Sequence, residues 1–170
     1  MRRLVILALL LALAALLLRP LGGERVPARP DPAAGYDEAL RRAAAIAARD
    51  GARVDTVCRT RLLTLGRRTP RAVVLLHGLT NCPGQFRALG ERLHERGANV
   101  FVPRLPGHGL ADRMSEAHAR LDAEALRRAT DEAVDVARGL GDSVVVVGLC
   151  VGGTMAAWAA QERADVARAV

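Results

Sequence analysis

The apolar positions of this sequence form short unbroken runs that are separated by longer amphipathic stretches. Short continuous apolar runs are typical of strands that are buried on both faces of a parallel sheet. They predict strands at residues 71–77, 99–103 and 143–147, and residues 166–170 open a further one. Residues 54–65 alternate in a strand-like way, and the residues predicted to share one face are Thr56, Cys58, Thr60, Leu62 and Thr64.

The stretches between these runs carry apolar residues at helical spacing. They predict helices at residues 36–49, 83–96, 122–139 and 151–162. The inward side chains of the second helix are predicted to be Phe86, Leu89 and Leu93. Asp122 is placed to cap the third helix, with Leu121 and Leu126 as a hydrophobic staple across the cap. Strands that alternate with helices predict an α/β fold with a mostly parallel sheet flanked by helices.

The N-terminal residues carry a different pattern. Two arginines precede an unbroken apolar run from Leu4 to Leu18, as in an export signal. A membrane-spanning helix needs about 20 apolar residues, and Arg19-Pro20 interrupts the run earlier. Residues 1–21 are therefore either a signal peptide that is removed or a signal-anchor helix that is retained. Both alternatives predict a protein that is exported or membrane-anchored and that faces the periplasm or the cell exterior.

Residues 22–35 are rich in proline, glycine and arginine, which predicts a linker. Residues 36–170 then form one domain, in keeping with the length of the chain. Three cysteines do not make a disulfide framework. In an oxidising compartment Cys58 and Cys82 could pair and leave Cys150 as a free thiol. Their spacing does not settle whether they come close enough to bond, so the pairing stays open.

The formal net charge of +7 comes from arginine, since the sequence contains no lysine. A basic balance can indicate nucleic acid or anionic lipid as a partner. Here the arginines are scattered and aromatic residues make up only 2% of the chain, so no nucleic-acid partner is predicted. Neither an H-E-x-x-H motif nor a Cys/His ligand spacing occurs, so no metal or other cofactor is predicted.

Chemistry is indicated most strongly at residues 148–153, which read G-L-C-V-G-G between a predicted strand and a predicted helix. This is the setting of a nucleophile elbow, with Cys150 in place of the usual serine. Side chains at Gly148 and Gly152 would collide with the adjoining strand and helix, so glycine is required there. The helix directs its N–H groups and its positive end at Cys150, which favours a nucleophilic thiolate. The alternative is a small buried cysteine that only packs in the turn.

Two further motifs follow buried strands, H-G-L-T at residues 77–80 and P-G-H-G at residues 106–109. The order and spacing of the three motifs resemble those of the α/β-hydrolase superfamily. The resemblance covers residues 71–170. The sequence is most similar in character to bacterial carboxylesterases, monoacylglycerol-lipase-like hydrolases and serine-aminopeptidase-like members, whose H-G-[FL]-T loop is followed by a Gln-Phe pair.

This resemblance implies a role for each motif. Cys150 would attack the acyl carbonyl, and the backbone N–H groups of Leu79 and Val151 would form the oxyanion hole. His77 would orient its loop through hydrogen bonds rather than move protons. His108 would either line the cavity or support its own loop. The supporting glycines are Gly78, Gly148 and Gly152.

The sequence departs from the superfamily pattern in two ways. The nucleophile is cysteine, as it is in dienelactone hydrolases of the same fold. The triad acid and base follow the nucleophile in this fold, whereas Asp165 comes too early after Cys150 to be the usual acid. The histidines, all upstream of that cysteine, are His77, His94, His108 and His118. The chain is therefore expected to be an N-terminal portion that stops after the helix following the elbow, which leaves the far edge of the strand at 143–147 unpaired.

Together these features predict a carboxylic-ester hydrolase of the esterase or lipase type. Its substrate would be a small-molecule acyl ester, and any membrane contact would be made through the N-terminal segment. Two alternatives stay open. One is a catalytically inactive hydrolase-fold fragment that serves as a binding scaffold, and the other is a serine-aminopeptidase-like peptidase homologue.

Overall fold

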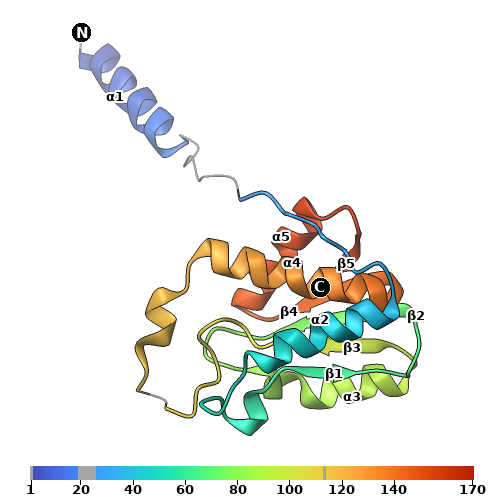
Figure 1. Ribbon diagram of the computed structural model, residues 1–170. Helices are drawn as coiled ribbons and strands as arrows, with labels where there is room; N and C mark the ends of the chain where they lie inside the picture. Colours follow the sequence, from blue (N-terminus) through green and yellow to red (C-terminus); the bar gives the residue numbers. More distant parts are fainter. Residues whose placement is uncertain (1, 19–25, 113) are drawn as a thin grey trace.

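The computed structural model describes residues 2–18, 26–112 and 114–170, and helices and strands alternate through it (Figure 1). The α-helices are α1 (Arg2–Leu17), α2 (Tyr36–Ala48), α3 (Arg87–Glu95), α4 (Ala123–Leu140) and α5 (Val151–Glu162). The strands are β1 (Arg61–Leu63), β2 (Thr69–Leu76), β3 (Asn99–Val102), β4 (Gly141–Gly148) and β5 (Val166–Ala169). Short 3₁₀ helices are η1 (Thr56–Cys58), η2 (Pro83–Phe86) and η3 (Glu116–Arg120).

The strands form one five-stranded sheet in the order β1-β3-β2-β4-β5. β1 is antiparallel to β3, and the other neighbouring strands are parallel to each other. β2 and β4 pair along their whole length, from Thr69 opposite Gly141 to Leu76 opposite Gly148. The predicted α/β fold with a mostly parallel sheet is therefore confirmed.

Helices lie on both faces of this sheet (Figure 1). α4 and α5 pack on one face, with α2 against α4, whereas α3 packs on the opposite face. Successive side chains of a strand point to opposite faces. In β2, Val74 and Leu76 are therefore buried in the core beneath α4 and α5, while Val73 and Leu75 are buried in the core on the α3 side. This double burial explains why residues 72–76 of β2 are an unbroken apolar run.

α4 continues into β4 without a loop. The helix begins after Asp122, whose side chain accepts the Ala125 N–H at 2.7 Å, so the predicted cap is confirmed. It ends at Leu140, one residue beyond the predicted end, and β4 begins at Gly141. A Cβ on Gly141 would lie 2.5 Å from the Ala72 nitrogen, so the junction can pass β2 only with glycine.

The strand-like stretches expected at residues 54–65 are confirmed only in part. Only Arg61–Leu63 forms a strand, because the preceding residues turn into η1. The side chain of Asp55 accepts the Val57 N–H at 3.1 Å and so favours this turn over an extended chain. The predicted alternation of one face across the whole segment is lost at this turn.

Two further expectations about packing are also wrong. Leu89 is exposed, because α3 starts only after η2 and turns Gly90 toward the core instead. The far edge of β4 is paired, because β5 runs parallel to it with Val166 opposite Val144 and Ala169 opposite Val146.

A buried cluster of charges joins α4 to the end of α5 and the start of β5. The side chain of Arg163 is fully buried and contacts Asp131 at 2.8 Å, Asp135 at 2.6 Å and Asp165 at 2.8 Å. Burial alone would lower the pKa of Arg163, but its hydrogen bonds to Asp165, Asp131 and Asp135 outweigh burial and raise the pKa. The planar guanidinium can serve several carboxylates at once, which an ammonium group cannot do with the same geometry.

The segment predicted to be a linker is in part attached to the domain. Of residues 22–35, positions 22–25 lie outside the described residues. From Val26 onward the backbone forms hydrogen bonds: the Val26 oxygen accepts from Trp158 at 2.8 Å, and the Arg29 N–H donates to Asp131 at 2.9 Å. Residues 26–34 are therefore a strap that crosses α5 and α4 rather than a free linker.

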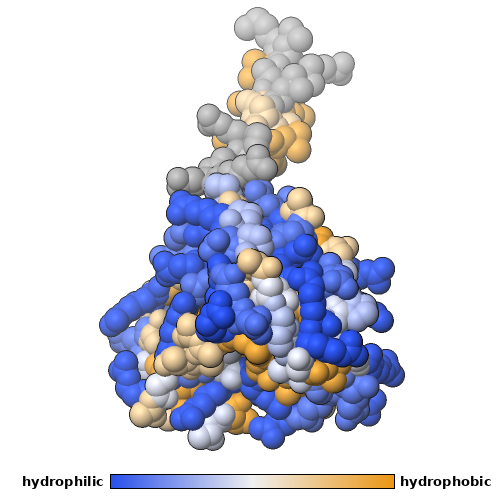
Figure 2. Space-filling model, turned by 45° about the vertical axis from the view of Figure 1, so that its right-hand side comes forward, coloured by the Kyte–Doolittle hydropathy of each residue, from blue (hydrophilic) through white to orange (hydrophobic). Residues whose placement is uncertain are grey.

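The N-terminal segment forms the helix α1, whose described side chains are exposed. In Figure 2 the coloured atoms of α1 are apolar, and they project from a domain face that is mostly hydrophilic, with apolar patches toward its base. Within the described ranges, no helix is both long enough and apolar enough to span a bilayer. The remainder of the predicted leader, residues 1 and 19–21, lies outside the described residues.

Candidate active site

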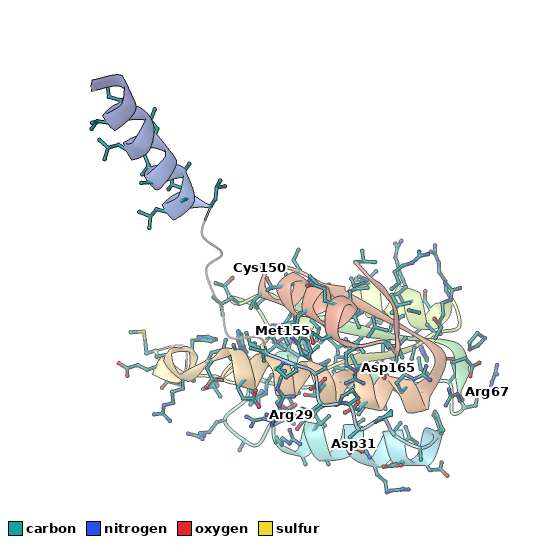
Figure 3. The ribbon with its side chains drawn as sticks, turned by 90° about the horizontal axis from the view of Figure 1, so that it is seen from above. Arg29, Asp31, Arg67, Cys150, Met155 and Asp165 are labelled. Atoms are coloured by element: carbon teal, nitrogen blue, oxygen red, sulfur yellow. A yellow bond between two sulfur atoms is a disulfide. The ribbon has the colours of Figure 1, made fainter. Side chains whose placement is uncertain are left out.

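Cys150 occupies the turn between β4 and the N-terminal end of α5 (Figure 3). With φ of 58° and ψ of −120°, it is the only non-glycine residue of positive φ in the part of the chain that the structure describes. Such strain persists only where the surrounding contacts enforce it. A Cβ on Gly148 would lie 2.0 Å from the Gly152 oxygen, and one on Gly152 would lie 1.9 Å from the Leu76 oxygen. The close contacts predicted for the two glycines are therefore present.

The Cys150 thiol is free, because the other two cysteines are bonded to each other, and the residue is exposed. The alternative of a buried packing cysteine is therefore wrong. Val151 is the first residue of α5. Its N–H group, like that of Leu79, donates no hydrogen bond to any described residue. The loop containing Leu79 lies beside the cysteine, since a Cβ on Gly78 would be 3.4 Å from the Cys150 Cβ. The structure thus brings an exposed thiol close to a loop and a helix end with unused N–H groups.

His77 follows β2 and is completely buried. Its Nε2 accepts the Leu105 N–H at 3.1 Å, which leaves the ring proton on Nδ1 to be donated to the Gly78 oxygen at 3.0 Å. The Asn81 N–H donates to the same oxygen at 3.1 Å. In a trans peptide the C=O and the following N–H point in opposite directions, so these bonds also fix the direction of the Leu79 N–H. Both ring nitrogens of His77 are occupied, which fits a role in orienting the loop rather than in proton transfer.

The second predicted histidine, His108, is also completely buried. Its Nδ1 is 2.8 Å from the Pro106 oxygen, and its ring contacts that of His77 edge-on with the ring centroids 5.0 Å apart. Arg104 fixes the same turn, because its guanidinium donates to Asp50 at 2.7 Å and to the His108 oxygen at 3.0 Å. Of the two roles left open for His108, this burial favours support of its own loop.

The two remaining histidines lie outside this network or at its rim. His118 is exposed in η3, with its ring centroid 4.4 Å from that of His108. His94 lies near the end of α3, just before β3 begins. It is therefore near the amino ends of the parallel strands, whereas Cys150 follows the carboxyl end of β4. Among the residues that the structure describes, no three His, Cys, Asp or Glu side chains are grouped to hold a metal ion.

Sequence reasoning missed how the loop between β2 and α3 is held. The Gln85 Oε1 atom accepts the Gly78 N–H at 3.0 Å. Cys58 and Cys82, whose pairing the sequence left open, form a disulfide with their Cα atoms 5.1 Å apart. The Gln-Phe pair after the H-G-L-T loop was a visible signal. The pattern alone, however, does not reveal that the glutamine side chain turns back to the glycine.

Acid is expected to destabilise the protein through His77. Burial, together with the nearby charges, lowers the pKa of His77 from 6.5 to about 4. The unfolded chain therefore binds a proton more readily than the native state between these values. The stabilisation is complete above about pH 6.5 and is lost as the pH falls toward 4, by about 3 kcal/mol in total.

Urea unfolding at several pH values measures this effect, with a His77→Asn variant as the comparison. The variant should start less stable at pH 7.5 and lose less of its remaining stability on acidification than the unmodified protein. Parallel pH profiles for the two proteins would contradict the prediction. A His94→Asn variant is the control for the substitution itself, because this histidine is only partly buried and belongs to α3.

The chain is similar to a known protein family and to one lipase of known name. The model of a family described as having the alpha/beta hydrolase fold matches residues 71–170. The thermostable monoacylglycerol lipase of Bacillus sp. (strain H-257) is 31% identical over 105 residues, which cover 57% of this chain and 38% of that lipase. The chain thus spans well under half of the length of this relative.

Two solved structures resemble the fold. One is a dienelactone hydrolase-like promiscuous phosphotriesterase from metagenomic libraries, with a TM-score of 0.51 and 20% identity over 66% of this chain and 52% of that one. The other, a protein called m3DLH, has a TM-score of 0.51 and 23% identity over 65% of this chain and 51% of its own. At these identities the likeness shows the arrangement of the strands and helices alone.

Proposed function

Because the chain belongs to the α/β-hydrolase fold family, we propose that it carries the acyl-transfer machinery of a carboxylic-ester hydrolase, with Cys150 as the nucleophile. The observation that carries the proposal is the exposed thiol at a positive-φ turn, beside a loop and a helix end whose N–H groups are unused. The similarity to a monoacylglycerol lipase supports an ester as the substrate class.

The proposed first step forms a bond between the Cys150 sulfur and the acyl carbon. The carbonyl electron pair moves onto oxygen, and the N–H groups of Leu79 and Val151 stabilise the resulting oxyanion. When the C=O bond re-forms, the alcohol oxygen leaves with the bonding electrons and takes up the proton that the thiol has lost, and a thioester remains on Cys150. Water then attacks the thioester, releases the carboxylic acid and regenerates the thiol.

The acid and base for this reaction are not assigned to the histidines described above. His77 is buried with both ring nitrogens in hydrogen bonds, and His94 lies near the amino ends of the strands, away from Cys150 at their carboxyl ends. In this fold the acid and the base follow the nucleophile in chain order, so the proposal places them after residue 170. Acylation by an activated ester does not need them, because a nitrophenolate leaves as a stable anion.

An apolar cavity beside α5 supports an acyl substrate. It has a volume of about 140 Å³, and Leu126, Met155 and Trp158 contribute to its wall. Thr154, which lies one helical turn after Cys150, also lines it, whereas Cys150 itself does not. Figure 3 shows Met155 further along α5 than the cysteine, on the side toward the domain interior.

We further propose that the protein is exported or membrane-anchored. The apolar helix α1 supports this location, because a cationic start followed by an apolar run is the pattern of an export signal. The disulfide between Cys58 and Cys82 supports it independently, because disulfides persist in oxidising compartments outside the cytosol. Protease accessibility of the domain on intact cells, compared with broken cells, tests the location.

Replacing Cys150 with alanine is expected to abolish acylation. Mixing the protein with p-nitrophenyl acetate should release a burst of one equivalent of nitrophenolate, and the Cys150→Ala variant should show none. Alanine meets the same positive φ as cysteine, so the thermal unfolding midpoint should change little. Leu149→Ala, which alters an exposed neighbour, should keep the burst. A burst that survives in Cys150→Ala would exclude this cysteine as the nucleophile.

A further inference from the structure

The loop between β2 and α3 is held to the rest of the domain at more than one point. Gln85 accepts the Gly78 N–H through its side-chain oxygen at 3.0 Å. Cys82 is disulfide-bonded to Cys58 of η1. Gly84 also approaches η1 closely, since a Cβ there would lie 2.9 Å from the Val57 oxygen. These contacts bind the two ends of the loop to each other and bind its middle to η1.

The disulfide and Gln85 act on the same short segment. The Gln85 N–H donates to the Cys82 oxygen at 2.9 Å, so the backbone that carries the glutamine is fixed relative to the disulfide. Cys58 is itself held firmly, because it is buried and a Cβ on Gly109 would lie 2.6 Å from its Cβ. The position of the Gln85 side chain therefore depends on an anchor outside the loop.

Both peptide groups that flank the Gly78 Cα are hydrogen-bonded. Gln85 holds its N–H, while His77 and Asn81 hold its C=O. The C=O of Gly78 and the N–H of Leu79 belong to one trans peptide, so a rotation of this peptide would turn the Leu79 N–H away and break the bonds to Gly78. Loss of the Gln85 bond frees the preceding peptide, so that only the bonds from His77 and Asn81 to the Gly78 oxygen still oppose this rotation.

We propose that Gln85 is a positioning residue for acyl transfer and that the Cys58–Cys82 disulfide keeps it in place. Both act through the Gly78–Leu79 peptide, and neither contacts the reacting atoms. The inference rests on the proposed function of Cys150. It predicts that removing either support slows reactions that develop an oxyanion and leaves other reactions of the same thiol unchanged.

Two reactions of Cys150 separate this role from a general structural one. Acylation by p-nitrophenyl acetate passes through an oxyanion. Alkylation by iodoacetamide does not, because the sulfur displaces iodide from a saturated carbon. In Gln85→Met, which keeps the length of the side chain but removes its acceptor, acylation should slow about tenfold, because a well-aimed oxyanion donor contributes up to 10²–10³-fold. Alkylation should stay within a factor of about two.

The double variant Cys58→Ser, Cys82→Ser should show the same selective loss of acylation. Gln161→Met makes the same substitution at an exposed position near the end of α5 and should leave both rates unchanged. Unchanged acylation in Gln85→Met would overturn the inference. Acylation and alkylation that fall by the same factor would overturn it too, because the substitution would then act on access to the thiol.

Hydrogen exchange gives a readout that does not depend on activity. The Gly78 amide should be protected in the unmodified protein and should exchange at least about tenfold faster in Gln85→Met, because its acceptor is lost. Exchange that is equally fast in both proteins would show that the Gln85 contact is not formed. An unmodified protein without a Cys150-dependent burst would overturn the proposed function and the catalytic part of this inference, while the exchange data would still decide the contact itself.

Discussion

The Gly152→Ala variant is expected to yield little or no folded protein. A Cβ at this position would lie 1.9 Å from the Leu76 oxygen and 2.5 Å from the Leu76 carbon, both of which are backbone atoms of β2. Overpacking of side chains in a core costs about 1–3 kcal/mol. Here no side chain can rotate away, so α5 would have to separate from the sheet. We expect a loss comparable to the total stability of a domain, about 5–15 kcal/mol.

The neighbouring glycine provides a matched control. A Cβ on Gly153 would come no closer than 3.5 Å to the Gly148 oxygen, which is an ordinary contact. Alanine also favours a helix over glycine by about 1 kcal/mol, so Gly153→Ala should be neutral or stabilising. Soluble yield, circular dichroism and the urea midpoint compare the two variants. A Gly152→Ala protein as stable as Gly153→Ala would mean that α5 does not pack on β2 in this way.

The second large effect is expected for Arg163→Met. Methionine fills a similar volume but leaves Asp135 buried without its cation and leaves Asp131 with Arg127 as its remaining cationic partner. Breaking a buried ion pair from one side costs about 3–5 kcal/mol. The loss should also extend to the strap, because Asp131 accepts the Arg29 N–H. Thermal unfolding should therefore show a midpoint lower by about 10 °C or more.

Arg67→Met serves as the control for this substitution. Its side chain lies at the periphery of the domain (Figure 3) and is exposed, so the change should stay within about 0.5 kcal/mol. Asp165 lies next to the buried cluster but is less buried, so Asp165→Asn should have an effect between the two. If Arg163→Met unfolds at the same temperature as Arg67→Met, the charges of the cluster are solvated in solution rather than buried.

The elements that the sequence predicted well are those whose pattern is dictated by local sterics or by burial on two sides. Residues 72–76 of β2 and 144–147 of β4 are unbroken apolar runs because they lie in the middle of the sheet, between layers of packed side chains on both faces. The elbow could be located because Gly148 and Gly152 meet backbone atoms at distances that no side chain tolerates. The N-cap at Asp122 involves residues only three positions apart. In each case the cause lies within a short stretch of sequence.

The features that could not be predicted depend on partners far away in the sequence. The strap at residues 26–34 has no periodicity, and its attachment comes from acceptors and donors on α4 and α5. η1 replaces an expected strand because the side chain of Asp55 turns the chain and a disulfide fixes Cys58 to Cys82. The contact of Gln85 with Gly78 links a side chain to a peptide group, and no hydropathy pattern reports such a pair.

Leu140 ends α4 and Gly141 begins β4, so the helix and the strand cannot shift relative to each other along the chain. No spare residues exist there to absorb an insertion. Because neighbouring positions of a strand face opposite sides, one inserted amino acid would exchange the two sides of β4 and carry the change forward to Cys150. The position of the thiol is thus set by the length of the chain between Asp122 and residue 150, so natural variation in length has to fall in loops elsewhere.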